Sequence, residues 1–281
     1  MTKIDSILII GLGLIGGSLA KRIKKYHPTA TLYGIAPSER TRSLAKESSL
    51  FKSVHKNITS APKTIDCVFV CTPIALVSET ILSASNHIES DCILTDVASI
   101  KESIVTTVKL HKKNHIFIPG HPMAGTEHTG FTASKEDIFT DSTYILIKTK
   151  EDNTVLKTFL KKLLVNIVET DAKTHDKMIA LASHFPYIVT TLIMSLVSEL
   201  SEKDKLLFKE LIGPGFKDTT RVAASSPEWG YDVCQHNIKN LHSLLTSLES
   251  NIENFKGKLS PNSKALKTFF DDMQQIKKIL N

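Results

Sequence analysis

An imidazole that could act as a base lies in the segment of residues 121–127 (HPMAGTE), well downstream of a glycine-rich fingerprint. A histidine with an unperturbed pKa of about 6.5 can take a proton near neutral pH while a bound cofactor takes a hydride. The proline after His121 favours extended backbone over helix, so we expect this imidazole in an irregular loop. These residue types predict proton abstraction coupled to hydride transfer.

The glycine fingerprint covers residues 11–16 (GLGLIG), which follow an apolar stretch and open a helical pattern. In that context GxGxxG predicts a dinucleotide-binding turn, because its glycines permit a tight turn and close approach of the pyrophosphate. The helix N-terminus adds unpaired amides and a positive dipole end. A glycine-rich turn without a ligand is the alternative. The residues expected at the cofactor are Gly11, Gly13, Leu14, Ile15 and Gly16.

The end of the second apolar stretch bears on the choice of cofactor. A site that prefers NAD places Asp or Glu there for the ribose 2′-hydroxyl, and this chain has Ala36. Ser38, Arg40 and Arg42 follow, and their hydroxyl and guanidinium groups can hold a 2′-phosphate. We therefore expect NADP in preference to NAD. Alternatively, the arginines face solvent on the next helix and Glu39 serves the ribose.

Two further segments follow predicted strands at the same edge of the sheet. Thr72 and Pro73 end the third apolar stretch, where the loop is expected to lie near the nicotinamide half of the cofactor. Proline suits the first turn of the next helix because it has no amide hydrogen. Ser99 lies in the segment of residues 96–101 (DVASIK), and we expect its hydroxyl beside His121. Capping of the following helix is the alternative role for Ser99.

The order of these elements predicts an α/β fold. Up to about residue 171, short apolar stretches alternate with helical patterns, which is typical of βαβ units and a largely parallel sheet. Long helical patterns follow from His175 onward, with a break at residues 213–215. We predict a Rossmann-like doubly wound sheet over residues 1–171 and an all-helical domain over residues 172–281. The expected strands are Ile7–Ile10, Leu32–Ile35, Cys67–Cys71, Ile93–Asp96, Ile116–Ile118, Tyr144–Ile147 and Ile167–Glu169.

The composition is that of an ordinary soluble globular protein, with 41% hydrophobic and 23% charged residues. The formal charge of +6 suits an anionic small substrate, and the lysines spread along helical faces favour solvated surfaces over nucleic-acid binding. The four cysteines show no CxxC pair and no metal-ligand spacing, which predicts a reduced, cytoplasmic protein without a metal site. No apolar run approaches about 20 residues, so we expect no membrane-spanning segment.

Five segments occur in order along the chain: residues 11–18 (GLGLIGGS), 96–101 (DVASIK), 121–127 (HPMAGTE), 183–186 (SHFP) and 215–221 (GFKDTTR). Together they resemble the prephenate/arogenate dehydrogenases of tyrosine biosynthesis, in the short monofunctional form. The resemblance covers most of the chain and implies that a cyclohexadienol substrate loses hydride from its hydroxyl-bearing carbon and carbon dioxide from its ring. It also implies NAD or NADP as the acceptor and a homodimer formed by the helical domain.

The resemblance implies roles for particular residues. His121 would accept the hydroxyl proton, and a structural histidine is the alternative. Arg221 would bind the ring carboxylate bidentately, with a salt bridge to Asp218 as the alternative. Glu127 would gate the cleft or pair with an arginine.

The helical domain is expected to supply the rest of the substrate pocket. His184 and Tyr187 lie one turn apart and would face the interdomain cleft, although a packed core role is the alternative for His184. A second histidine commonly fills the Tyr187 position in the family, so this departure affects how the substrate side chain is held. Trp229 would contact substrate or cap the helical core.

Two other functions fit parts of the sequence. A two-domain reductase such as a pyrroline-5-carboxylate reductase shares the plan but leaves the segment of residues 121–127 and the Arg221 segment without a role. A non-catalytic nucleotide-binding or nucleic-acid-binding protein is suggested only by the basic charge balance. The sequence does not distinguish prephenate from arogenate as the substrate.

Overall fold

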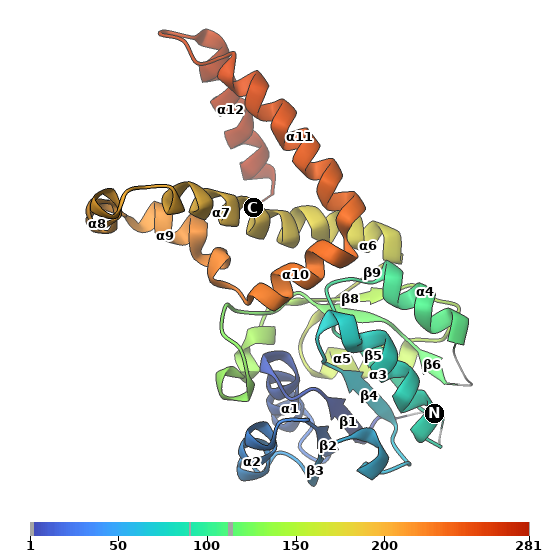
Figure 1. Cartoon of the computed structure of the whole chain (residues 1–281). Coiled ribbons are helices and arrows are strands. Elements are labelled where there is room, and N and C mark those ends of the chain that lie inside the picture. The colour runs from blue at the N-terminus through green and yellow to red at the C-terminus, as the bar shows by residue number, and fades with distance from the viewer. Residues whose placement is uncertain (1–2, 90, 112–114, 281) are drawn as a thin grey trace. The chain divides into compact units, whose positions relative to one another are not determined.

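The computed structural model describes residues 3–89, 91–111 and 115–280. Its contacts divide the chain into two units, Met1–Asn237 and Ile238–Asn281. Among the described residues, the first unit contains both sheets and helices α1 to α10, and the second contains α11 and α12 (Figure 1). The predicted domain boundary at residue 171 therefore lies inside the first unit, and it stays a prediction.

The larger sheet of the first unit has six parallel strands in the order β3-β2-β1-β4-β5-β6. This is the Rossmann order, in which the strand order reverses between the neighbouring strands β1 and β4. Ligands of this fold bind at that point, beyond the carboxyl ends of the strands. The sequence prediction missed β3, because its three residues form no apolar run. The strands are β1 (Ser6–Ile10), β2 (Thr31–Ile35), β3 (Ser53–His55), β4 (Cys67–Val70), β5 (Ile93–Asp96) and β6 (Ile116–Phe117).

Helices cover both faces of this sheet, as a doubly wound fold requires. Ile7 and Ile9 of β1 are buried in one core cluster with residues of α1 and α5, while Leu8 and Ile10 are buried in the other with residues of α3 and α4. Alternate side chains of a strand point to opposite faces, so β1 contributes to both cores. The helices are α1 (Leu14–Tyr26), α2 (Glu39–Glu47), α3 (Ile74–His87), α4 (Glu102–His111) and α5 (Thr154–Lys162).

A second sheet of three strands holds β7 (Gly120–Pro122), β8 (Thr143–Ile147) and β9 (Asn166–Thr170). β7 pairs antiparallel with β8, and β9 pairs parallel with β8. Two predictions were wrong here. The last two predicted strands do not extend the parallel sheet, and His121 lies in a short strand opposite Ile145 and not in an irregular loop. A three-residue strand containing Gly and Pro carries no apolar alternation by which it could be predicted.

The helical part of the first unit begins with a continuous stretch, α6 (Ala172–Ile179), a π-helical turn (Ala180–His184) and α7 (Phe185–Ser198). Pro186 has no amide hydrogen to donate to the Ala182 carbonyl, and the wider turn lies directly before this proline. The helices α8 (Glu202–Leu211), α9 (Pro214–Thr220) and α10 (Pro227–His236) follow. Of the predicted break at residues 213–215, only Gly213 lies between α8 and α9, whereas Pro214 and Gly215 begin α9.

Within the described ranges, Ala172–Ser198 is the one helical stretch that could cross a membrane by length and composition, with a mean hydropathy of 1.6. The sequence prediction of no such segment rested on uninterrupted apolar runs, and Ser183 and His184 interrupt this one. Four polar side chains of the stretch are buried within the protein: His175, Asp176, His184 and Thr190. The stretch therefore carries polar contacts that belong to the fold of the first unit.

The second unit is a helical hairpin of α11 (Ile238–Lys256) and α12 (Lys264–Ile279), seen side by side in Figure 1. The Phe255 ring near the end of α11 lies 5.5 Å from the Phe269 ring and 6.1 Å from the Phe270 ring of α12, measured between centroids. These aromatic contacts hold the two helices together near their connection.

A buried ion pair connects the two sheets of the first unit. Asp96, at the end of β5, and Lys101, just before α4, are both fully buried. The Lys101 Nζ donates hydrogen bonds to Asp96 Oδ2 and, at 2.7 Å, to the Gly120 carbonyl, while the Gly120 N–H donates to Asp96 Oδ1 at 3.3 Å. Burial lowers the pKa of Lys101, and the Asp96 carboxylate opposes this shift. The pair thus fixes β7, and with it the backbone at His121, against the parallel sheet.

We predict that Lys101→Met lowers the free energy of unfolding by about 3 to 5 kcal/mol, because it leaves the Asp96 carboxylate buried without its cation. Urea unfolding followed by circular dichroism measures the change. The double variant Asp96→Asn/Lys101→Met should lose less free energy of unfolding than Lys101→Met, because neither buried charge remains. The control is Lys63→Met, which breaks an exposed pair with Glu89 and should cost no more than about 1 kcal/mol. A loss for Lys101→Met as small as for this control would contradict the prediction.

Candidate active site

His121 is buried and contacts a second buried histidine. Its Nδ1 lies 2.9 Å from His175 Nε2, and the His175 Nδ1 lies 2.7 Å from Asp176 Oδ1. The pKa of His121 is held well below its usual range, first by burial and then by the neighbouring His175, Lys101 and His184. The His121 imidazole is therefore neutral at pH 7, the form that can accept a proton.

Asp176 binds the N-terminus of α4. Its Oδ1 accepts the N–H of Lys101 and its Oδ2 the N–H of Glu102, each at 2.8 Å, so a carboxylate from α6 caps a helix 75 residues away in sequence. Ser99 does not fill this role, since α4 begins at Glu102. The Ser99 hydroxyl is buried and bonds to no partner in the described part of the chain. That hydroxyl is therefore available to a ligand.

His184 lies at the end of the π-helical turn and is fully buried. Its Nδ1 is 3.3 Å from the Asn237 side-chain nitrogen, whereas its Nε2 is buried without a hydrogen bond among the described residues. Burial lowers the pKa of His184 to about 4. His184 is thus packed, as the core alternative predicts, yet it keeps one nitrogen that a bound molecule could satisfy.

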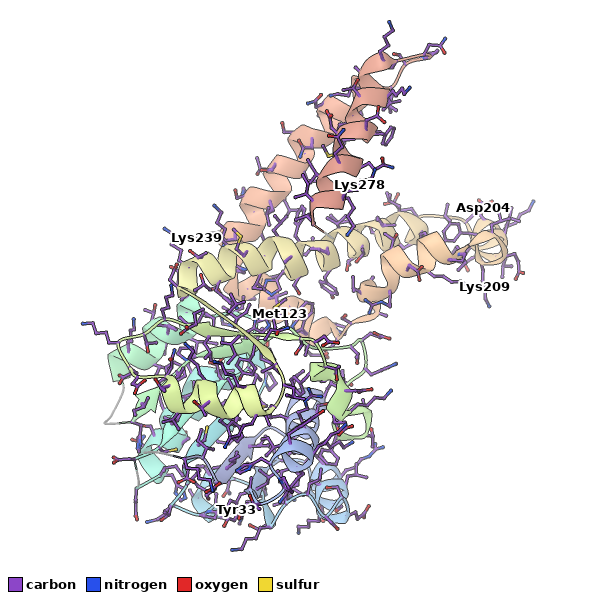
Figure 2. The ribbon with its side chains drawn as sticks, turned by 180° about the vertical axis from the view of Figure 1, so that it is seen from behind. Tyr33, Met123, Asp204, Lys209, Lys239 and Lys278 are labelled. Carbon is purple, nitrogen blue, oxygen red and sulfur yellow. The ribbon has the colours of Figure 1, made fainter. Side chains whose placement is uncertain are left out.

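Aromatic rings gather beside His184. The Trp229 ring centroid lies 5.9 Å from that of His184 and 5.2 Å from that of Tyr187, both edge to face. A Cβ atom at position 230 would lie 2.3 Å from the Tyr187 hydroxyl oxygen, so Gly230 leaves the space that Tyr187 occupies. The structure therefore brings the two predicted pocket residues, His184 and Tyr187, together with Trp229. Met123, which closely follows His121 and is labelled in Figure 2, packs against the same core cluster as Trp229.

The structure also brings Arg221 and Glu127 together. Arg221 Nη1 lies 3.2 Å from Glu127 Oε2, and the Arg221 side chain is 59% exposed. No ion pair joins Arg221 to Asp218 in the residues described, so the alternative partner was wrong. The pKa of Glu127 is lowered by its own backbone N–H and further by His128 and Arg221. Arg221 thus presents an exposed guanidinium that a substrate carboxylate could reach.

The glycine fingerprint has the geometry of a dinucleotide turn. Gly11 has φ of +96°, and a Cβ atom there would lie 2.5 Å from the Cys71 carbonyl oxygen. A Cβ atom at Gly16 would lie 2.0 Å from the Gly11 carbonyl oxygen, so α1 packs closely on the turn. Gly13 faces open space and caps α1 without a side chain, directly before Leu14 and Ile15. The first turn of α1 is therefore open to a phosphate group.

The residues after β2 lie around its carboxyl end. Arg42 Nη1 donates to the carbonyls of Ala36 at 2.9 Å and Pro37 at 2.5 Å, so Arg42 folds back toward the sheet, while Arg40 is exposed on α2. Ser38 caps α2 by accepting the Thr41 N–H at 3.4 Å. The alternative in which both arginines face solvent was wrong for Arg42.

Thr72 and Pro73 lie between β4 and α3. The Thr72 hydroxyl is buried and bonds to nothing within the described ranges. Pro73 is the N-cap residue of α3, one position before the first turn that the sequence predicted for it. A buried hydroxyl without a partner at the carboxyl edge of the sheet fits a group that binds a ligand there.

Three buried polar residues near His121 were not assigned to the site from the sequence: Lys101, His175 and Asp176. His175 and Asp176 are adjacent at the start of the long helical pattern, among the polar residues Lys173, Thr174 and Lys177, and side chains of their kind are seldom buried without partners. That pairing was the available signal. The sequence does not predict the partners of His175 and Asp176, because those partners come from segments that are distant along the chain.

Two family models match the chain. The nucleotide-binding domain of prephenate dehydrogenase matches residues 19–170, and the dimerization domain of prephenate dehydrogenase matches residues 171–275. The chain is 31% identical to the cyclohexadienyl dehydrogenase of Zymomonas mobilis, over 91% of this chain and 88% of that protein. It is 36% identical to the prephenate dehydrogenase of Bacillus subtilis, over 83% of this chain and 64% of that longer protein.

Solved structures agree with these matches. The arogenate dehydrogenase of Synechocystis superposes with a TM-score of 0.80 at 27% identity, covering 98% of this chain and 99% of that one. The prephenate dehydrogenase of Aquifex aeolicus, solved with hydroxyphenyl propionate and NAD+, has the same fold, with a TM-score of 0.88 at 24% identity and 98% of both chains covered. The matches of both family models and the identity over most of the chain lead to one conclusion: the chain belongs to the prephenate dehydrogenase family of oxidoreductases.

Proposed function

We propose that this chain catalyses the NAD(P)-dependent oxidative decarboxylation of prephenate or arogenate in tyrosine biosynthesis. The observation that carries the proposal is the buried, neutral His121, held on β7 beside the carboxyl edge of a dinucleotide-binding sheet. The names of the relatives support the substrate class, since they are cyclohexadienyl, prephenate and arogenate dehydrogenases.

His121 accepts the proton of the ring hydroxyl as that carbon loses its hydride. A bound nicotinamide dinucleotide supplies the hydride acceptor. Hydride loss makes that carbon a carbonyl, and the bond to the ring carboxylate then breaks, so carbon dioxide leaves. The electron pair of that bond enters the ring, which becomes aromatic as the carbonyl oxygen becomes a phenolate. The phenolate takes back the proton held by His121. General base catalysis of this kind contributes about 10² to 10⁴ in rate.

The remaining groups bind and orient the substrate. Arg221 binds the ring carboxylate, with Glu127 as its partner when substrate is absent. His184, through its unpaired Nε2, and Tyr187 hold the side chain that carries the second carboxylate. The buried Ser99 hydroxyl offers a hydrogen bond to the molecules bound beside His121 and the nicotinamide.

The cofactor binds at the glycine fingerprint of residues 11–16 and at Thr72 and Pro73. We propose NADP in preference to NAD. Ala36 places no acid at the end of β2, and the exposed Arg40 with Ser38 and Arg42 provides donors for a 2′-phosphate. The NAD+ in the Aquifex aeolicus structure and the exposed Glu39 favour the other choice.

We also propose a cytoplasmic homodimer of two-domain chains, divided at residue 171, without nucleic-acid or membrane partners. The second family model describes a dimerization domain. Apolar side chains are exposed on α7 and on α8, the helix on which Figure 2 labels Asp204 and Lys209. Large apolar side chains that are exposed in one chain can be buried in an interface with a second copy. The exposed residues are Leu192, Met194, Leu196, Leu206, Leu207 and Leu211.

A two-by-two assay tests the activity and the cofactor together. Purified protein is given prephenate or arogenate with NAD or NADP, and reduced-cofactor absorbance is followed. We expect turnover of at least one substrate and a higher kcat/KM with NADP, and Arg40→Ala should lower kcat/KM for NADP more than for NAD. A clear NAD preference would refute the cofactor choice. Absence of turnover in all four combinations would refute the function.

His121→Asn should lower kcat by about 10² to 10⁴, because the amide cannot take the hydroxyl proton. The dissociation constant of the cofactor, measured by fluorescence titration, should change little. His87→Asn is the matched control. His87 is the last residue of α3 and bonds to the Ala61 carbonyl, so this substitution should leave kcat unchanged. A wild-type kcat for His121→Asn would exclude His121 as the base.

Arg221→Ala should raise the substrate KM about 10- to 100-fold, because a charge-assisted hydrogen bond to the ring carboxylate is lost. The matched control, Lys63→Ala, also removes the cation of an exposed ion pair and should leave KM unchanged. Steady-state kinetics at saturating cofactor measure both. If KM stays at its wild-type value in Arg221→Ala, the ring carboxylate binds elsewhere.

A further inference from the structure

We propose that His175 and Asp176 position the catalytic proton acceptor: they fix the tautomer of His121 so that its Nδ1 carries the hydrogen and its Nε2 is free to take the substrate proton. The inference rests on the proposed role of His121 as the base. It assigns no contact with substrate to His175 or Asp176, which act through His121.

The assignment starts from Asp176. An ionised carboxylate only accepts hydrogen bonds, and Asp176 already accepts the N–H groups of Lys101 and Glu102 at the start of α4. Its Oδ1 also lies 2.7 Å from His175 Nδ1. At that distance His175 Nδ1 must be the donor. A neutral imidazole has one N–H, so His175 Nε2 carries a lone pair.

The same reasoning passes to His121. Its Nδ1 lies 2.9 Å from His175 Nε2, and two lone pairs cannot face each other at that distance. The His121 Nδ1 therefore donates, which leaves His121 Nε2 without hydrogen. The opposite tautomers would set the lone pair of His175 Nδ1 against the Asp176 carboxylate. The neutral pair thus has one hydrogen-bonding pattern, and that pattern makes His121 a base at Nε2.

Burial makes this pattern rigid and gives it an electrostatic role. His121, His175 and Asp176 are 7%, 1% and 2% exposed. The Lys101 ammonium donates to Asp96 and to the Gly120 carbonyl, whereas the contacts of the Asp176 carboxylate come from backbone amides and from His175. A proton that arrives on His121 therefore adds positive charge to a buried cluster that contains the Asp176 carboxylate. In this low-dielectric surrounding, Asp176 stabilises the imidazolium through His175.

Nitrogen-15 spectra of histidine-labelled protein, recorded without substrate, test the tautomer directly, because they distinguish Nδ1–H from Nε2–H imidazoles. The resonance of His121 is assigned by its loss in His121→Asn. We expect the Nδ1–H form for both His121 and His175. An Nε2–H form of His121 in the wild-type protein would overturn the proposal, whatever the activity. The spectra give their answer even if prephenate and arogenate are not turned over, so the two proposals can fail separately.

The variant His175→Phe tests the consequence. It keeps a buried ring and leaves Asp176 on the amides of α4, so the helix cap is retained. We expect kcat to fall about 10²- to 10⁴-fold, as loss of tautomer control does in a Ser-His-Asp triad, and the His121 spectrum to shift toward Nε2–H. Cofactor affinity should stay close to wild type. The unfolding temperature should fall, because two buried hydrogen bonds are lost, but the variant should remain folded at the assay temperature. His87→Phe is the matched control. A wild-type kcat, or an unchanged His121 spectrum, in folded His175→Phe would overturn the positioning role.

Discussion

The buried Lys101 connects the three elements that surround His121, and the geometry of the site depends on it. Its ammonium group binds Asp96 at the end of β5 and the carbonyl of Gly120 on β7, while its backbone N–H binds Asp176 on α6. Lys101 therefore binds the parallel sheet, the short strand β7 that carries His121, and helix α6, and it fixes their relative positions. Breaking a buried ion pair is costly, so these elements cannot separate without a large loss of stability.

This arrangement keeps His121 neutral. The imidazole lies among groups that disfavour its charged form, since burial and the neighbouring Lys101, His175 and His184 all lower its pKa. A base that stays unprotonated at neutral pH is ready to accept a proton, but its conjugate acid needs stabilisation. Asp176 supplies the opposite charge one imidazole away. Burial and the neighbouring cation and imidazoles thus keep His121 neutral, whereas a different group, the Asp176 carboxylate, stabilises its protonated form.

The sequence predicted the parts of the structure that local patterns encode, and missed the parts that long-range pairing decides. The Gly11 turn and the strand β1 follow from neighbouring residues, and both were predicted. The second sheet was not, because nothing local shows that β8 pairs with the three residues around His121. The same holds in the site. Asp218 was considered for Arg221 because it is close in sequence, whereas the observed partner is 94 residues away.

The two ends of the candidate site differ in rigidity for a physical reason. The His121–His175–Asp176 chain is buried, so each hydrogen bond would be lost at a high desolvation cost, and its geometry is fixed before any ligand arrives. The Arg221–Glu127 pair is exposed to water, where an ion pair contributes little. Exchanging the Glu127 carboxylate for a substrate carboxylate would therefore cost little. A rigid base and an easily exchanged anion partner suit a reaction in which the substrate must be oriented on a base that is already in place.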